Sequence, residues 1–237
     1  MSLLNNVTIV LFICHVLGDF QFQSQEMSDV KIKSLYGLIK HLLIHALVLI
    51  LLPILLFGWN ILSELWLLVF SVWLSHCILD MIKFSLRSYK KLTQETLYIV
   101  DQLLHILLIL LLSEYVFNSN RTLNIGSSNI LKWILLLLVI AKPANITFKI
   151  VFQKFQFKTN SETIPGAGAI IGNLERILSA IFLAMNQITA IGFIYTAKSI
   201  ARFKEIEENR GFAEYYLIGT LFSILYVLIA YFFIIVL

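Results

Sequence analysis

The sequence predicts an all-α integral membrane protein, a polytopic bundle of about seven transmembrane helices. Hydrophobic residues make up 59% of the 237 residues and charged residues only 14%, a balance that excludes an ordinary soluble domain. Apolar stretches of about 18 residues or more, the length needed to cross a bilayer, recur along the whole chain. Histidine and aspartate lie inside several of these stretches at helical spacing, which is unusual for a membrane segment.

Four apolar segments in the first half of the chain are each long enough to span a bilayer. They cover residues 3–20, 40–57, 61–82 and 94–117. The stretch between the first two, residues 21–40, is rich in glutamine and lysine and is expected to be a loop. Pro53 should kink the second helix, and a turn from Gly58 to Asn60 should separate it from the third. The four helices are expected to form one membrane unit, residues 1–117.

Three further segments are expected to be helical in the second half of the chain. They cover residues 130–152, 169–197 and 213–237. A turn rich in asparagine and serine, residues 118–129, should precede the first of these helices, and Pro143 should interrupt it. The proline and glycines of residues 165–168 should end the loop before the next helix. We expect a second unit over residues 118–237.

Histidine and aspartate form four pairs in which the two residues are four positions apart. The pairs are His15 with Asp19, His41 with His45, His76 with Asp80, and Asp101 with His105. The chain contains five histidines and four aspartates, and eight of these nine residues belong to the pairs. Random placement would give roughly a third of one such pair. On a helix this spacing puts both side chains on one face, one turn apart.

Loop charge predicts the orientation of the chain in the membrane. Lysines and arginines gather in the loops after the first, third and fifth helices, so these loops should lie in the cytoplasm and the amino terminus outside. This orientation puts all four pairs near the cytoplasmic face. The basic stretch 198–210 conflicts with it, because a seventh crossing would leave that stretch outside. Either this stretch escapes the rule, or a segment between residues 130 and 197 is re-entrant.

The pairs indicate a site for a divalent metal. Ionisable residues inside a bilayer cost roughly 2.5–3.5 kcal/mol each and usually mark function, and helix bundles hold metals with such inward-facing side chains. Nitrogen and oxygen donors without thiolates suit Zn²⁺ first, with Mn²⁺ or Fe²⁺ as alternatives. Eight donors suffice for one or two metals per chain. A proton relay and purely structural polar packing are the other interpretations. Cys14 and Cys77 point off the shared faces and are expected only to pack.

A metal-dependent hydrolase is the function that this site favours. Water activated by the metal would attack an ester, amide or phosphoester of a lipid or another amphiphile at the cytoplasmic leaflet. One carboxylate among Asp19, Asp80 and Asp101 would act as general base. The polar side chains expected to bind the substrate are Gln23, Lys83, Arg176, Lys198 and Arg202. The partners would be membrane lipids and a small amphiphilic substrate; the formal net charge of +4 requires no nucleic acid.

Two other classes of function would use the same residues. A transporter or channel for divalent cations or protons could line its pathway with them, and a non-catalytic sensor could bind a metal or haem through them. A transporter needs polar residues that continue to the far side of the membrane, whereas the first four helices are almost wholly apolar beyond the pairs. This contrast favours an enzyme. Haem with two histidine ligands is disfavoured because three aspartates share the cluster.

The four pairs also carry a resemblance to a known family. The stretches concerned are His15-x-Leu-Gly-Asp19-Phe-x-x-Gln23, His41-x3-His45, His76-x3-Asp80-x2-Lys83 and Asp101-Gln-x2-His105. They resemble a bacterial family of polytopic membrane proteins described as domain of unknown function 3307, over roughly residues 10–110. Three later strings, residues 172–176, 197–203 and 214–220, resemble the segment that longer members carry after this domain. The resemblance implies a protein of the bacterial cytoplasmic membrane and supplies no activity.

The style of the site is similar to two groups of enzymes. One is the membrane-bound metal-dependent hydrolases, and the other is the seven-helix ceramidase-like hydrolases with cytoplasmic His/Asp zinc sites. The order of the motifs differs from that of the second group, so the similarity is an analogy of site.

Overall fold

The computed structural model describes residues 5–89, 92–117, 128–156, 164 and 166–237. Within these ranges the chain is helical and contains no strand. Six of the described helices are long and apolar enough to cross a membrane, and a bent pair at the amino-terminal end would make a seventh. The chain is therefore an integral membrane protein with the predicted all-α polytopic fold. Residues 118–127 of the predicted turn, and Pro165, lie outside the described residues.

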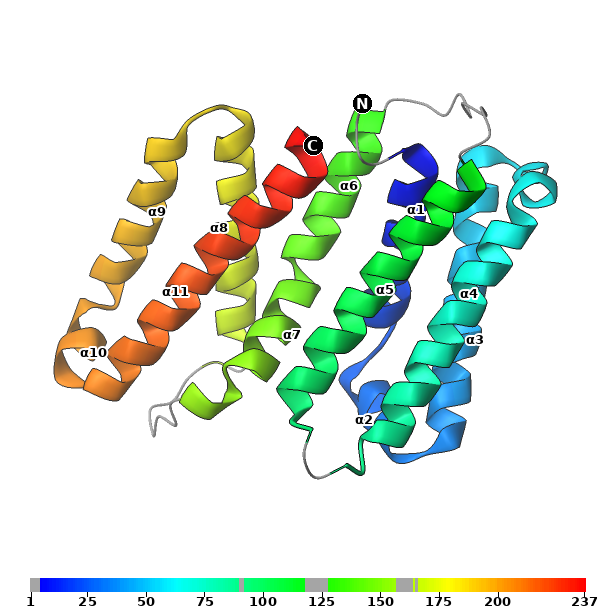
Figure 1. Cartoon of the computed structure of the whole chain (residues 1–237). Helices are drawn as coiled ribbons and strands as arrows, with labels where there is room; N and C mark the ends of the chain where they lie inside the picture. The colour runs from blue at the N-terminus through cyan, green and yellow to red at the C-terminus, as the bar shows by residue number, and fades with distance from the viewer. Residues whose placement is uncertain (1–4, 90–91, 118–127, 157–163, 165) are drawn as a thin grey trace. The chain divides into compact units, whose positions relative to one another are not determined.

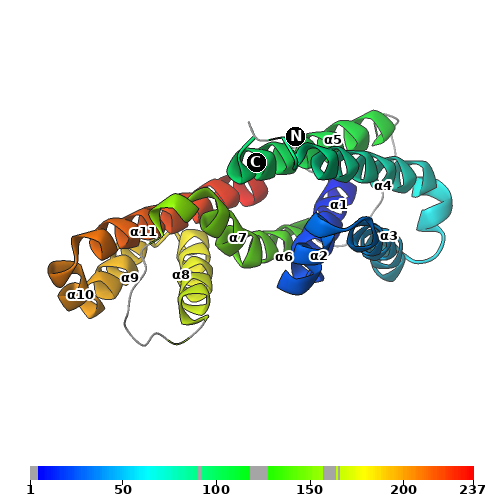
Figure 2. The same cartoon turned by 90° about the horizontal axis from the view of Figure 1, so that it is seen from below.

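The chain divides into two compact units, Met1–Leu135 and Leu136–Leu237. The first unit is built on α1 (Asn6–Val16), α3 (Leu35–Phe57), α4 (Ile61–Leu86) and α5 (Gln94–Phe117). Successive members of this set run in opposite directions (Figure 1). α1 packs against α3 and α5, and α4 packs against the same two helices (Figure 2). The four helices thus close a ring around a common interior.

The first helix ends in a sharp bend. A π-helix, η1 (Leu17–Gln21), follows α1 directly, and the next helix, α2 (Gln25–Lys33), is bent away by 88°. The side chain of Ser24 accepts a hydrogen bond from the Met27 amide at 3.1 Å and so begins α2. The prediction of a loop over residues 21–40 is therefore wrong for most of its length. A short polar helix and a polar loop have the same low hydropathy, so the composition could not separate them.

α2 folds back onto the first turn of α3 at unusually close range. The Ser34 side chain accepts a hydrogen bond from the Gly37 amide at 3.1 Å and donates one to the Val30 carbonyl at 3.2 Å. A Cβ atom at Gly37 would lie 2.5 Å from the Val30 carbonyl carbon, a distance that no side chain tolerates. Gly37 therefore allows the contact that fixes α2 against α3.

The second unit begins near the break between α6 (Ser128–Ile140) and α7 (Lys142–Val151), which confirms the predicted interruption near Pro143. Its other elements are α8 (Ala167–Ala184), α9 (Ile188–Ala201), α10 (Phe203–Glu208), α11 (Arg210–Tyr231) and η3 (Phe232–Val236). Within this unit α8 packs against α9 and α11.

The predicted single helix over residues 169–197 is wrong, because α8 and α9 are separate helices. They form an antiparallel hairpin whose turn includes Asn186 at a positive φ of 55°, a conformation that asparagine tolerates better than most residues. α9 returns the chain to the end at which α8 begins (Figure 1). The chain thus turns back between α8 and α9, ahead of the basic stretch 198–210.

We expect Gly37→Ala to lower the thermal unfolding midpoint of the detergent-solubilised protein. The added methyl group would overpack the α2–α3 contact, which costs about 1–3 kcal/mol. Gly192→Ala is the matched control, since a Cβ at this position inside α9 has nothing within 4 Å and alanine favours a helix over glycine. Scanning fluorimetry of both variants would measure the effect, and equal midpoints would contradict the close approach of α2.

Candidate metal centre

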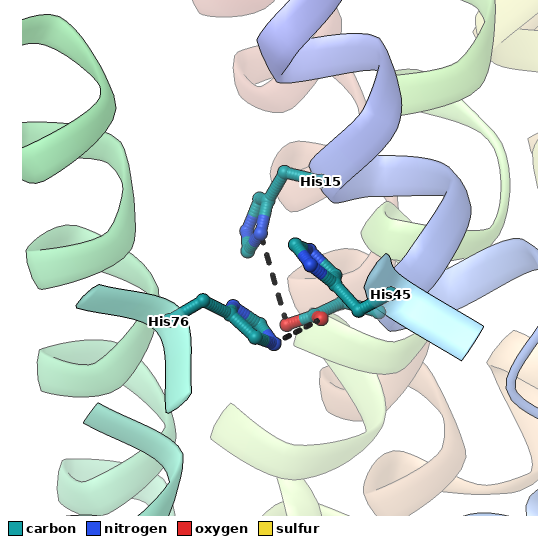
Figure 3. A group of neighbouring side chains, drawn as sticks. His15, His45 and His76 are labelled. Carbon is teal, nitrogen blue, oxygen red and sulfur yellow. Dashed lines mark ion pairs between the residues drawn. The ribbon is translucent and has the colours of Figure 1, made fainter. Parts of the chain in front are cut away.

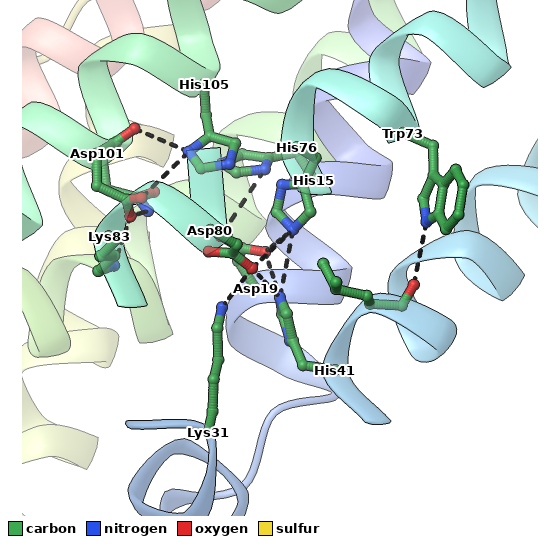
Figure 4. Close-up of polar contacts among 12 residues, drawn as sticks. His15, Asp19, Lys31, His41, Trp73, His76, Asp80, Lys83, Asp101 and His105 are labelled. Atoms are coloured by element: carbon green, nitrogen blue, oxygen red, sulfur yellow. Dashed lines mark hydrogen bonds and ion pairs between the residues drawn. The ribbon is translucent and has the colours of Figure 1, made fainter. Parts of the chain in front are cut away.

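All four predicted pairs meet in the interior of the first unit. The four helices alternate in direction. Pairs near the end of α1 and α4 therefore come close to pairs near the start of α3 and α5 (Figure 3 and Figure 4). The five histidines are at most 3% exposed, and the three aspartate side chains at most 7%. We call the eight residues the His/Asp cluster; they are His15, Asp19, His41, His45, His76, Asp80, Asp101 and His105.

The π-helix and a glycine give the cluster its place at the end of α1. Asp19 lies in η1, where its carboxylate turns into the bundle, and its Oδ2 atom is 3.9 Å from His15 Nδ1. π-helical turns of this kind are frequent at functional sites. The neighbouring Gly18 has the ring of His45 against it, and a Cβ there would lie 2.5 Å from His45 Cδ2. Only glycine at position 18 leaves room for this ring.

Four donor atoms of the cluster, two imidazole nitrogens and two carboxylate oxygens, are joined by five distances close to those between the ligands of a tetrahedral metal site. We call them the tetrahedral set; they are His41 Nε2, His76 Nε2, Asp19 Oδ1 and Asp80 Oδ2. His41 Nε2 is 3.3 Å from His76 Nε2. The four distances from these two nitrogens to the two carboxylate oxygens are 3.3, 3.4, 3.4 and 3.5 Å. Five of the six edges of the set are therefore nearly equal.

These distances fit metal ligands better than hydrogen bonds. Charge-assisted hydrogen bonds between nitrogen and a carboxylate oxygen measure about 2.7–2.9 Å, which is clearly shorter. A tetrahedral zinc ion with ligands at about 2.0–2.1 Å holds those ligands roughly 3.3–3.4 Å apart. The five edges of 3.3–3.5 Å match the second value. The tetrahedral set could thus hold a Zn²⁺ ion through two imidazoles and two carboxylates.

The other four cluster residues, which we call the outer set, provide further ligand capacity. They are His15, His45, Asp101 and His105. His105 Nδ1 is bonded to the Asp101 carbonyl oxygen at 2.8 Å, which leaves its Nε2 without a hydrogen-bond partner among the described residues. The rings of His15, His45 and His76 point toward one another in Figure 3, and the ring of His45 stacks on His76 at 3.7 Å. Three groups of possible ligands have their donor atoms within 4.8 Å of one another among the described residues: His15, Asp19, His45 and His76; His41, His76 and Asp80; and Asp80, Asp101 and His105.

Unpaired buried polar atoms of the described residues are confined to this cluster. In that part of the chain, every buried side-chain nitrogen or oxygen without a hydrogen-bond partner belongs to the eight residues. Both ring nitrogens of His15 and of His45 are in this state. Buried polar atoms in native proteins are almost always hydrogen-bonded, because each unpaired one costs about 1–3 kcal/mol. These atoms could therefore serve as ligands of a metal ion.

Two lysines contact the carboxylates of the cluster. Lys31 on α2 places its Nζ 2.8 Å from Asp80 Oδ2, and Lys83 on α4 forms an ion pair with Asp101 (Figure 4). Gln102 also donates to Asp101 Oδ2, at 3.0 Å. Lys83 was expected near the site, but Lys31 was not, because its segment was expected to be a loop and its spacing to the pairs carries no helical period. Gln23, also expected to bind substrate, lies half-buried between η1 and α2.

The two cysteines pack as expected. Cys14 and Cys77 are buried free thiols, and none of the possible ligand groups among the described residues includes either. Cys14 Sγ lies 3.7 Å from the Val48 carbonyl oxygen. The donor atoms of the candidate centre are thus nitrogen and oxygen alone.

The first unit corresponds to a known family. The sequence model of the family described as "Protein of unknown function (DUF3307)" matches residues 7–142, more than half of the chain. The chain belongs to this family. The resemblance that the four pairs carry is thereby confirmed, and the DUF3307 match includes all eight cluster residues. Comparisons with curated proteins and with solved structures give no match.

Three of the residues expected to bind substrate lie in the second unit, after the DUF3307 match. Lys198 Nζ is 2.8 Å from Glu175 Oε2, and Arg202 Nη1 is 3.9 Å from Glu205 Oε1. Each of these two cations therefore has a carboxylate partner within its own unit. Glu175 and Arg176 are adjacent in sequence and, as adjacency on a helix predicts, they have different partners.

Arg176 forms the polar centre of the second unit. Its buried guanidinium donates hydrogen bonds to five acceptors: the carbonyls of Ile140 and Ala141 and the side chains of Asn145, Asn173 and Ser223. A Cβ at Gly172 would lie 3.1 Å from Nη1, so this glycine leaves room for the guanidinium. Arg176 thus satisfies the carbonyls at the α6–α7 break.

We expect Arg176→Met to destabilise the protein without changing its metal content. The substitution removes five hydrogen bonds in the second unit, and each buried acceptor that keeps no other donor costs about 1–3 kcal/mol. The matched control is Arg202→Met, because the Arg202 side chain is 41% exposed and contacts a single carboxylate. Thermal unfolding in detergent and elemental analysis would measure both properties. A stable Arg176→Met protein with normal function would contradict this structural role.

Proposed function

We propose that this DUF3307 protein is an integral membrane hydrolase that depends on a divalent metal. The tetrahedral set is the observation that carries the proposal, since five of its six edges have the length expected between zinc ligands. Zn²⁺ is the metal that the nitrogen and oxygen donors suit first, and Mn²⁺ and Fe²⁺ are alternatives. The outer set would orient the ligands or hold a second ion.

The charges around the cluster favour a bound cation. Its three carboxylates face two ammonium groups, those of Lys31 and Lys83, so one negative charge remains if the histidines are neutral. Burying an uncompensated charge costs several kcal/mol. A divalent ion would change this sum from −1 to +1 and would also give the unpaired imidazole nitrogens a partner. The same ion would make the site positive and suited to activating water.

The chemistry proposed is the attack of water on an ester, amide or phosphoester. A bound metal supplies a Lewis acid that makes water acidic and polarises the substrate. Asp101 is the carboxylate outside the tetrahedral set, so we assign it the role of general base that accepts the proton of the attacking water. His105, held by the Asp101 carbonyl at 2.8 Å, presents Nε2 as a second proton acceptor in the same region.

The position of the cluster favours a lipid or another amphiphile as substrate. Asp19, Asp80 and Asp101 lie within about two turns of the helix ends next to α2, at a depth where headgroups meet acyl chains. Basic loops at this end would place it in the cytoplasm, with the amino terminus outside, by the positive-inside rule. The protein would thus act on the cytoplasmic leaflet of the bacterial cytoplasmic membrane.

The interior beyond the cluster favours an enzyme over a transporter. Among the described residues of α1, α3, α4 and α5, the buried polar side chains outside the cluster are Thr8 and Ser113. Thr8 donates to Asn5 and Ser113 to the Leu110 carbonyl, both within their own helices. A pathway for ions or protons needs polar groups that continue across the membrane. This part of the ring is closed by apolar packing.

Purified full-length protein should carry one or two first-row divalent metals per chain. Buried imidazoles without partners are stable only if a ligand satisfies them. Elemental analysis after extraction in mild detergent without chelator measures the content. Chelator should also lower the thermal midpoint, since a ligand bound only to the folded state stabilises it. A protein that is free of metal and indifferent to chelator would refute the proposal and favour a proton relay.

Loss of a carboxylate of the tetrahedral set should lower metal affinity as much as loss of one of its histidines. Asp80→Ala and His76→Ala should each weaken metal affinity by roughly 10–100-fold and abolish chelator-sensitive hydrolysis of a panel of lipid esters, amides and phosphoesters. Cys77→Ser is the control, since it adjoins His76 on α4 but lies outside the ligand groups. Normal metal content in Asp80→Ala and His76→Ala, with loss only in Cys77→Ser, would show that the metal ligands lie on another face of α4.

A further inference from the structure

Lys31 and Lys83 lie between the His/Asp cluster and the surroundings of the first unit. The side chains of Lys31 and Lys83 are 13% and 33% exposed, whereas those of their partners Asp80 and Asp101 are 1% and 4% exposed. The exposure therefore rises outward from the carboxylates to the ammonium groups. A ligand that approaches the cluster from this side meets the lysines before it meets the carboxylates.

Both lysines are held in place by the fold. Lys83 follows Asp80 by three positions on α4, so it projects from the same region of that helix. Lys31 comes from α2, which is fixed against α3 by the Ser34 hydrogen bonds and by the close approach at Gly37. Two separate elements thus bring one ammonium group each to two different carboxylates. This arrangement differs from lysines that extend freely from a surface.

Charge balance indicates what these lysines bind once a metal is present. The carboxylates and the two ammonium groups sum to one negative charge, so one divalent ion raises the sum to +1 and two ions raise it to +3. When Asp80 turns to the metal, the partly buried Lys31 ammonium group loses its partner, whereas Lys83 stays beside Asp101. A carboxylic ester or an amide is neutral and leaves this positive charge uncompensated. A phosphoester brings one or two negative charges, and its oxygens accept from lysine ammonium groups.

We propose that Lys31 and Lys83 bind the phosphate of a phosphoester, and that this is the substrate class of the hydrolase. The inference rests on the function proposed above and selects one of its three substrate classes. In the reaction the oxygen of water bonds to phosphorus, and the bond between phosphorus and the ester oxygen breaks. One proton of the water goes to a cluster base, and the leaving oxygen takes up a proton. The products are an alcohol and a phosphate, or a phosphomonoester from a diester.

Binding of inorganic phosphate to the metal-loaded full-length protein tests the lysines directly. Calorimetry in detergent should show Lys31→Met and Lys83→Met each weakening phosphate binding by roughly tenfold or more, the effect of losing one charged hydrogen bond. Lys31→Arg keeps the charge and should stay close to the wild type. Lys33→Met is the matched control, since it removes the same charge from an exposed position on α2. Metal content is measured on every variant, and phosphate affinities are compared only among variants that contain as much metal as the wild type.

Two arms distinguish a lipid headgroup from a soluble phosphate. One offers glycerol phosphate in solution, and the other offers nanodiscs of phosphatidylcholine with and without phosphatidic acid. Preferential competition by phosphatidic acid assigns a lipid source, and equal or better competition by glycerol phosphate assigns a soluble one; either result supports the lysine site.

Different experimental results would overturn the phosphoester assignment and the proposed function. The phosphoester assignment is overturned if protein with one or two metals binds no phosphate. It is also overturned if the Lys31→Met/Lys83→Met double variant binds phosphate like the wild type. In both cases the proposed metal site is unaffected. Wild-type protein without metal would overturn the proposed function, and the inference with it.

Discussion

The desolvation of the His/Asp cluster is the constraint on which the first unit depends. Eight polar side chains are removed from water within a ring of four apolar helices, and contacts within a pair leave most of their polar atoms without a hydrogen bond. The pairs must therefore meet one another, and this requires alternating helix directions and pairs at one level. Even then the ring nitrogens of His15 and His45 have no hydrogen-bond partner among the described residues. A metal ion is the partner that the 3.3–3.5 Å spacing of the tetrahedral set fits.

The two units differ in whether their buried polar groups have hydrogen-bond or ion-pair partners. In the second unit the Arg176 guanidinium has five acceptors, and Glu175 has Lys198, so these buried charges are satisfied within the protein. In the first unit the imidazoles are left with open nitrogens. The second unit thus shows buried charges that are paired by partners within the protein, as is usual in native structures. The open nitrogens are therefore the groups that we propose to bind a metal, whereas Arg176 supports the α6–α7 break.

The bend after η1 brings α2 against the His/Asp cluster. By turning through 88°, the chain lays α2 across the end of the ring and brings Lys31 to Asp80. The site is consequently lined by apolar packing toward one end of the helices and by ammonium groups toward the other. Ammonium groups at one end of the site would suit a substrate whose reacting group is negatively charged. Beyond the cluster, the buried polar side chains among the described residues of these four helices are Thr8 and Ser113.

The sequence by itself determined the membrane class, most of the helices and the eight cluster residues, because hydropathy and a four-residue period are local properties of the chain. α5 lies at its predicted bounds, and the break near Pro143 was expected. Only the tertiary structure decided the tetrahedral set, the α8–α9 hairpin and the role of Lys31. These features depend on the left-handed Asn186, on the close approach at Gly37 and on contacts between residues far apart in sequence. No local period records such contacts, since they arise from the directions in which helices pack.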